Sequence, residues 1–209
     1  MKNNILSNIC SFVDEKIAVY QLDLVNYIST ENMLPNKEGV SLSAGLPNTV
    51  YTQAYHEGDV LISNIRPYFR KIWYADKCGG CSNDVLVLRA NDNVNSHFLY
   101  YLLSEDNFFD YTTVTAKGTK MPRGDKNAIM QYKVPDLPFD LQVDIAKTLA
   151  VLDAQIFNNL KINHHLSDSM SETLSSPDIK RGKRVSRRVA RRRFSLRLKR
   201  ICSNKEVVA

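Results

Sequence analysis

Residues 58–89 read GDVLISNIRPYFRKIWYADKCGGCSNDVLVLR and carry the clearest strand signals of the chain. Three short runs, DVLISNI, RKIWYA and NDVLVLR, are rich in β-branched and aromatic residues, which favour β-strands. Pro67 separates the first two runs, and Gly79 with Gly80 stands where a hairpin turn is needed before the third. The pattern predicts a β-meander of three consecutive strands.

Weaker signals surround this segment. The stretch ILSNICSFVDEK predicts a helix, VYQLDLVNYI predicts a strand, and Ser96 is placed to cap a helix over HFLYYLLS. That last helix has one apolar face that should pack on the sheet, formed by Phe98, Leu99, Leu102 and Leu103. Together these signals predict a mixed α/β domain of the α+β class, with a small twisted β-sheet and packed helices.

A long helix is predicted from Asp140 over LQVDIAKTLAVLDAQIFNNLKINHHL. Apolar residues recur along it at steps of four, three and four, and two asparagines continue the same seam. Periodicity alone fits packing on its own domain equally well. Asparagine on a seam costs stability but sets register between paired helices, so the pattern favours a specific partner helix. The predicted pairing residues are Ile145, Leu149, Leu152, Ile156, Asn159 and Asn163.

Charge divides the chain into two parts. Residues 175–209 hold 13 of the 28 Lys and Arg against only Asp178 and Glu206, a net charge of +11, so the remaining residues carry −5. A segment so basic repels itself and has little apolar surface to bury. We therefore predict three parts: a folded domain over 1–139, the long helix over 140–166, and a linker with a disordered Arg-rich tail over 167–209.

Composition limits the class of protein. With 209 residues, 44% hydrophobic and 24% charged, the chain fits a soluble folded domain. No stretch approaches 18 to 20 uninterrupted apolar residues, and the first residues lack a secretion signal. We expect a cytoplasmic protein without a membrane partner, whose four cysteines are reduced.

Catalytic signatures are weak. Cys78 and Cys81 have the CxxC spacing of a redox pair or half a zinc site, but no second ligand pair accompanies them, so we predict no metal site. The basic loop AKGTKMPRG lacks the spacing of an ATP-binding loop. Asn64 is not followed by the two prolines of an amino-methyltransferase motif, and Asp84 has no second acid beside it for a nuclease metal. The sequence predicts no catalytic residues.

Two loops carry residues suited to nucleic acid. Arg and Lys neutralise phosphates, Arg and Asn match base edges, and a glycine lets backbone approach a phosphate. The alternative is that these loops are ordinary solvated turns on an acidic body. The candidate DNA-binding residues are Asn64, Arg66, Tyr68, Arg70, Lys117, Gly118, Thr119, Lys120 and Arg123, with Phe69 beside them.

Two motifs carry a family resemblance. The first is G-D-V-L-x-S-x-x-R, which begins at Gly58 and ends at Arg66. The second is P-x-L-P, a spacer, and IA-x-x-L-x-x-x-D-x-x-I followed by asparagines, running from Pro135 to Asn163. Over about residues 10–166 the chain resembles one half of the specificity subunit of type I restriction-modification systems. It departs from the pattern at Leu141, where many members have Glu before the glutamine.

The resemblance implies a non-catalytic DNA-recognition subunit that reads one half of a bipartite site in double-stranded DNA. It implies that the helix acts as a spacer and docks methyltransferase subunits, with restriction subunits completing the complex. The chain itself would need no cofactor, since S-adenosylmethionine, ATP and Mg would belong to those partners. Where a full subunit has a second recognition domain, this chain has its basic tail, so we expect a homodimer through the long helix.

Two alternatives come from other classes of protein. One is a small DNA-modifying or redox enzyme that uses Cys78 and Cys81. The other is a protein that binds nucleic acid nonspecifically through its basic tail.

Overall fold

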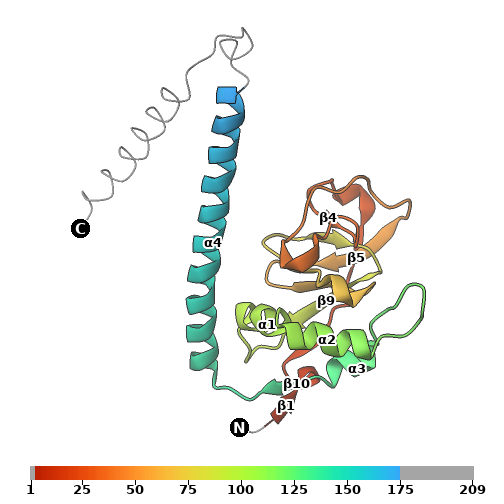
Figure 1. Ribbon diagram of the computed structural model, residues 1–209. Coiled ribbons are helices and arrows are strands. Elements are labelled where there is room, and N and C mark those ends of the chain that lie inside the picture. The colour runs from red at the N-terminus through yellow and green to blue at the C-terminus, as the bar shows by residue number, and fades with distance from the viewer. Residues whose placement is uncertain (1–2, 175–209) are drawn as a thin grey trace, which may run out of the picture. The chain divides into compact units, whose positions relative to one another are not determined.

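The computed structural model describes residues 3–174 (Figure 1). Among them no helix is long and apolar enough to cross a membrane. The strands are β1 Asn3–Ile5, β2 Cys10–Phe12, β3 Lys16–Ala18, β4 Tyr27–Ile28, β5 Tyr51–Tyr55, β6 Val60–Ser63, β7 Ile72–Tyr74, β8 Gly79–Cys81, β9 Val85–Ala90 and β10 Lys133–Pro135. The α-helices are α1 Ser96–Leu103, α2 Asp106–Val114, α3 Lys126–Met130 and α4 Phe139–Leu174. Short 3-10 turns are η1 Leu6–Asn8, η2 Val19–Gln21, η3 Pro35–Lys37 and η4 Pro67–Phe69.

The three strands predicted within residues 58–89 form part of one sheet, but not as a meander. That sheet has the order β2-β9-β6-β7, so β9 pairs with β6 rather than with β7, as a meander of the three predicted strands would require. Between β7 and β9 the chain leaves this sheet and adds β8 to a second one, ordered β3-β5-β8-β4. A chain that makes this excursion cannot return as a simple hairpin, which is why the predicted strand order is wrong.

Gly79 and Gly80 lie inside β8 and do not form the predicted hairpin turn. β8 pairs in parallel with β4 and antiparallel with β5, with Gly80 opposite Tyr27 and Ala54. A side chain at Gly79 would collide with the backbone oxygen of Asn26 and with the ring of Tyr55. The glycines therefore serve close approach within a sheet.

The core has two layers, one on each face of the first sheet. Along β6, Val60 and Ile62 belong to the cluster shared with α1 and α2, whereas Leu61 belongs to the cluster shared with the second sheet. β9 alternates in the same way. Strands covered on both faces need continuous apolar sequence, which explains the runs VLI and VLVL. Figure 1 shows α1 and α2 on one side of β9, and β4 and β5 on the other.

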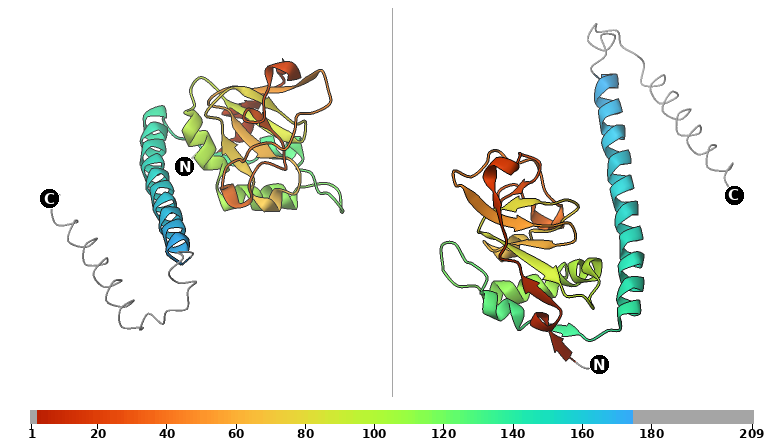
Figure 2. Two further views of the ribbon diagram at one scale, coloured as in Figure 1. Left: turned by 90° about the horizontal axis from the view of Figure 1, so that it is seen from above. Right: turned by 180° about the vertical axis from the view of Figure 1, so that it is seen from behind.

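Near the N-terminus the predicted helix and strand are wrong. Instead of a helix, η1 is followed directly by β2, which pairs with β9. Instead of one long strand, the second stretch forms η2 and the two-residue β4. β1 pairs with β10, so the N-terminal segment lies beside the entry to α4 (Figure 2).

The predicted helix after the sheet is confirmed as α1, whose four predicted apolar residues are all buried. Its cap is Asn95 rather than Ser96, because the Asn95 side chain accepts a hydrogen bond from the N–H of Phe98 at 2.9 Å. The cap lies close to α4, since Gln142 Oε1 accepts from the N–H of Asn95 at 3.1 Å.

The predicted long helix is present as α4, and it extends past Leu166 to Leu174. Residues 167–174, expected to be a linker, are therefore helical. The N-terminal part of α4 packs on the domain through the buried Gln142 and Ala146, and the Tyr101 hydroxyl donates to Asp153 at 2.8 Å. A second compact unit begins at Ala154. The Arg-rich tail over 175–209 lies outside the described residues.

Candidate nucleic-acid interface

The turn after β6 holds its arginines in a strained backbone. Arg66 and Arg70 flank η4 with φ of 51° and 53°, the left-handed region that non-glycine residues rarely adopt. Pro67, with its fixed φ, begins the 3-10 turn between them, and the N–H of Arg70 donates to Pro67 O at 2.9 Å. Such conformations cost about 1–3 kcal/mol each and gather at functional sites.

The second predicted loop, residues 117–123, is closed at its base like a hairpin. The N–H of Lys117 donates to Arg123 O at 2.8 Å, and the N–H of Arg123 donates to Lys117 O at 2.9 Å. Gly118 has φ of 96°, which only glycine adopts without strain. Thr119 and Lys120 are exposed at the tip. The loop projects from the domain between α2 and α3 (Figures 1 and 2).

The structure joins these two loops, which are about fifty residues apart in sequence. Ile65 and Arg123 form an antiparallel bridge, the N–H of Arg66 donates to Pro122 O at 2.8 Å, and the N–H of Gly124 donates to Asn64 O at 3.0 Å. Residues 64–70 and 117–123 thus form one surface, which we call the basic loop surface. All nine predicted DNA-binding residues belong to it.

Acidic side chains pair with three of the predicted cations. Arg123 Nη2 lies 2.9 Å from Asp84 Oδ1, and Lys117 Nζ lies 2.5 Å from Asp125 Oδ2. The hydrogen bond from Lys117 lowers the pKa of Asp125 below its usual value. Arg70 pairs with two aspartates of α2. Among the described residues, Arg66 and Lys120 have no ion-pair partner, so their charges are available to an anionic ligand.

Aromatic rings add a second kind of contact. Tyr68 and Phe69 are 49% and 39% exposed, and their ring centroids lie 4.8 Å apart. Lys71 Nζ lies 5.8 Å from the Phe69 ring. In duplex DNA, exposed rings beside cations can contact sugars and the methyl group of thymine.

Asn64 lies at the junction between the two loops, and its side chain is less available than the sequence indicates. Its Oδ1 is buried and, among the described residues, has no hydrogen-bond partner. A side chain at Gly124 would approach this oxygen to 3.0 Å. The role of Asn64 as a base contact stays a prediction.

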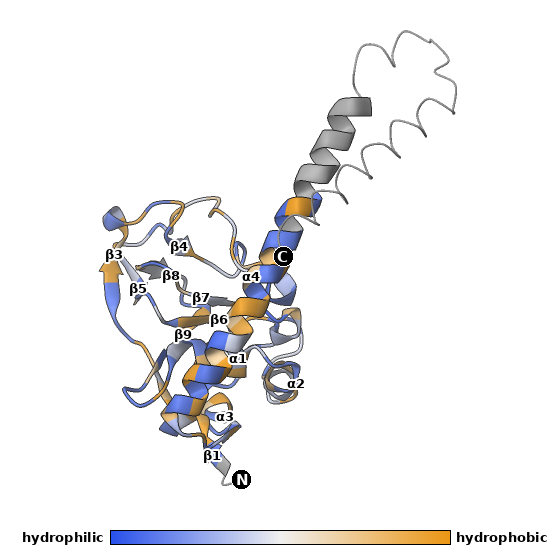
Figure 3. Ribbon diagram, turned by 90° about the vertical axis from the view of Figure 1, so that its left-hand side faces the viewer, coloured by the Kyte–Doolittle hydropathy of each residue, from blue (hydrophilic) through white to orange (hydrophobic). Residues whose placement is uncertain are grey.

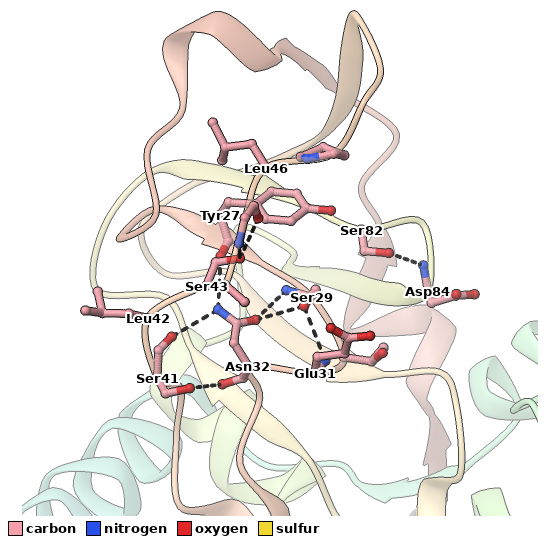
Figure 4. A pocket seen from close by; sticks show the side chains of 14 residues that line it. Tyr27, Ser29, Glu31, Asn32, Ser41, Leu42, Ser43, Leu46, Ser82 and Asp84 are labelled. Carbon is pink, nitrogen blue, oxygen red and sulfur yellow. Dashed lines mark hydrogen bonds between the residues drawn. The ribbon is translucent and has the colours of Figure 1, made fainter.

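A polar cavity of about 520 Å³ lies beside the basic loop surface, and nothing in the sequence predicts it. Asp84, the partner of Arg123, lines it, as does Thr30, whose carbonyl accepts from Lys71 Nζ at 2.6 Å. Asn32 holds its walls together. The Asn32 side chain donates to Tyr27 O and Ser41 O and accepts from the Ser29 N–H (Figure 4).

The cysteine pair does not have the environment of a redox site. Cys81 is fully buried in β8, and burial raises the pKa of its thiol to about 12. Redox and nucleophilic cysteines need a lowered pKa and access to solvent. Within residues 3–174 no group of three or more potential metal ligands occurs.

The predicted helix-pairing residues divide into two groups. Ile145 is half-buried and packs against the core of the domain, and Leu149 is also half-buried. Leu152 and Ile156 are 49% and 58% exposed. Asn159 and Asn163 are exposed. The structure therefore leaves only the part of the seam from Leu152 onward open to a partner.

Comparison with known families identifies the domain. Residues 14–166 match the family described as the type I restriction modification DNA specificity domain. The chain belongs to this family. A curated relative of the specificity domain is the type I restriction enzyme EcoDI specificity subunit of Escherichia coli, 29% identical over 106 residues. That segment makes up 49% of this chain and 23% of the relative.

Solved specificity subunits share the fold. The HsdS subunit from Thermoanaerobacter tengcongensis is similar with a TM-score of 0.58 and 17% identity, over 83% of this chain and 47% of that one. The type I restriction-modification S subunit from M. genitalium gives 0.56 and 17%, over 83% and 45%. A chain from a structure of the assembly and conformational transition of the type I R-M system gives 0.56 and 19%, over 82% and 46%. The chain thus spans less than half the length of each of these relatives.

Proposed function

We propose that this chain is a half-subunit that reads one half of a bipartite site in double-stranded DNA through the basic loop surface. The observation that carries the proposal is the junction of the two loops, which places strained arginines, exposed aromatic rings and a glycine-bearing lysine loop together. Phosphate contacts position a protein on DNA, and base contacts specify sequence. This surface has residues suited to both.

The proposal assigns different roles to the two loops. Arg66 is held by its strained backbone and lacks an acidic partner among the described residues, so its guanidinium can match a guanine edge bidentately. Lys120, at the exposed tip beside Gly118, acts as a point charge on phosphate. The chain supplies recognition only, and methyl transfer and ATP-driven cleavage belong to methyltransferase and restriction subunits that dock on it.

The experiment is a selection of bound oligonucleotides with the methyltransferase chain present, followed by measured affinities. We expect Arg66→Ala to reduce discrimination at one position of the selected site by about 1–3 kcal/mol. Lys120→Ala should weaken binding to all sequences alike and reduce the salt dependence, because it removes one phosphate contact. Equal losses on all targets for both variants would contradict this assignment of roles.

The proposal also includes pairing of two copies through the exposed part of α4. Large apolar side chains stand open along it, including Leu152, Ile156, Phe157 and Ile162, which are each about half exposed or more. Figure 3 shows apolar and polar stretches alternating along the coloured part of α4. Apolar residues left open along a helix mark a surface that a partner covers.

A further inference from the structure

Two strained segments meet at one carboxylate. Besides Arg66 and Arg70, the described non-glycine residues with positive φ are Asn36 and Lys37, both in η3, with φ of 54° and 66°. The N–H of Lys37 donates to Arg70 O at 3.0 Å, so the two segments are hydrogen-bonded to each other. Lys37, which the sequence does not single out, therefore lies next to the basic loop surface.

Asp106 binds both cations. Lys37 Nζ lies 2.7 Å and Arg70 Nη1 lies 3.1 Å from the same oxygen, Asp106 Oδ1. A second aspartate, Asp110, lies 3.5 Å from Arg70 Nη2. Both terminal nitrogens of the guanidinium are thus engaged, each by a different carboxylate.

The element that carries these carboxylates is firmly anchored. Phe108 and Phe109 of α2 are buried in the core, at 0% and 1% exposure. Asp106 therefore has a fixed backbone from which to hold Lys37 and Arg70. The hydrogen bond from Lys37, with the nearby Arg70 charge, lowers the pKa of Asp106, so the carboxylate stays ionised at neutral pH.

We infer that Asp106 is a positioning residue for DNA recognition, which fixes the Arg70 guanidinium and holds Lys37 beside it. The inference rests on the proposed function. A guanidinium has five N–H donors, and the ion pairs leave several free to contact DNA. A free arginine loses rotamer entropy when it binds a base, whereas one already held by carboxylates has lost it before binding. Asp106 therefore increases selectivity although its charge opposes binding to phosphate.

The test depends on two opposite effects of the Asp106 charge, which should lower affinity for DNA but raise selectivity. In the full chain with its methyltransferase partner, Asp106→Asn removes a negative charge, so affinity for unrelated duplex should stay equal or rise. Discrimination between the selected site and a site changed at one base pair should fall about tenfold, the order of one base-edge contact. Asp92→Asn, the same change at an exposed residue of the β9–α1 turn, should leave discrimination unchanged.

A second variant separates positioning from a general effect on folding. Arg70→Lys keeps the charge but replaces the planar guanidinium, whose two terminal nitrogens contact Asp106 and Asp110 separately, by a single nitrogen. It should therefore lose discrimination as Asp106→Asn does. The double variant should lose no more than the larger single loss, because both changes remove the same arrangement. Asp110→Asn should show a smaller loss, given its longer contact. Thermal unfolding of each variant reports whether the domain remains folded.

The outcomes distinguish the inference from the function on which it rests. If the unmodified complex binds all duplexes alike, the proposed function is wrong. If it is selective but Asp106→Asn raises affinity for selected and unrelated duplexes by the same factor, Asp106 only repels DNA and the inference fails. Additive losses in the double variant would also overturn it, because Asp106 would then not act through Arg70.

Discussion

Asp59 explains part of the motif that begins at Gly58, because its buried carboxylate forms an ion pair with Arg89. Its carboxylate binds Arg89 through both oxygens, at 2.8 and 2.9 Å, and its side chain is 2% exposed. Asp59 Oδ2 also accepts from the N–H of His56 at 2.8 Å. Hydrogen bonds from Arg89 to Asp59 and Glu15 raise the pKa of the guanidinium, which stays charged. Gly58 has φ of 90°, so a side chain there would strain this turn.

We expect Asp59→Ala to lower the free energy of unfolding by about 3 kcal/mol, since removing one partner leaves the other charge partly buried. This is the lower end of the range for a broken buried pair, because Glu15 still contacts Arg89 at 2.6 Å. Urea unfolding measures the loss. Glu57→Gln, at an exposed neighbour, serves as the control and should change stability by less than about 0.5 kcal/mol. A loss as small as that for Asp59→Ala would mean that the pair adds little to stability.

At the scale of single residues, the sequence indicates the chemistry of each side chain but not what surrounds it in the fold. The nine loop residues have side chains suited to DNA, and the structure joins the two loops that carry them. Sequence could not indicate that Asn64 Oδ1 is buried or that Asp106 binds Arg70, because those facts depend on segments far apart in the chain. Nothing in the sequence indicates the positive φ of Arg66 and Arg70, since arginine rarely adopts this region.

Elements were predictable where a local pattern dictates them. The helix α4 follows from its apolar period, and α1 from its apolar face, whereas the order β9-β6-β7 and the second sheet depend on non-local pairing. Gly79 illustrates the difference. Two adjacent glycines indicate a turn by local rules, yet here they let β8 lie against Asn26 and the buried Tyr55.

This packing makes Gly79→Ala a test of the second sheet. The added methyl group would lie 2.6 Å from the Tyr55 hydroxyl and would collide with the Asn26 oxygen, so β4 or β8 must move. We expect a loss of about 2–3 kcal/mol in the free energy of unfolding, within the usual range for overpacking. The single tryptophan, Trp73, packs edge-to-face on Tyr55 at 5.7 Å and reports the transition by fluorescence.

Gly45→Ala is the matched control, because its methyl group would meet nothing within 4 Å and its φ is not positive. Its stability should be unchanged or slightly higher, since alanine reduces the freedom of the unfolded chain. Equal stability of the two variants would show that the sheet around Gly79 is looser than described.

At the scale of the whole molecule, large apolar side chains of α4 from Leu152 onward are exposed. The helix has 36 residues and is about 54 Å long at a rise of 1.5 Å per residue. Its first turns pack on the domain through the buried Gln142 and Ala146. From Ala154 to Leu174 it spans about 30 Å, close to one turn of duplex DNA at about 34–36 Å. Two copies pairing antiparallel there would present two recognition domains to a palindromic site with a fixed gap.

The pairing is tested by placing charge on the open part of the seam. Leu152→Asp with Ile156→Asp should convert a dimer into a folded monomer, because each side chain contributes up to about 1.5–3 kcal/mol when covered and a buried aspartate would be unpaired. Such a monomer should bind half-sites weakly but keep its sequence preference. Gln155→Asp, at an exposed polar position between them, adds charge without removing apolar contact and should remain dimeric. Sedimentation that shows the unmodified chain as a monomer at high concentration, with no binding of the methyltransferase chain, would rule out pairing through α4.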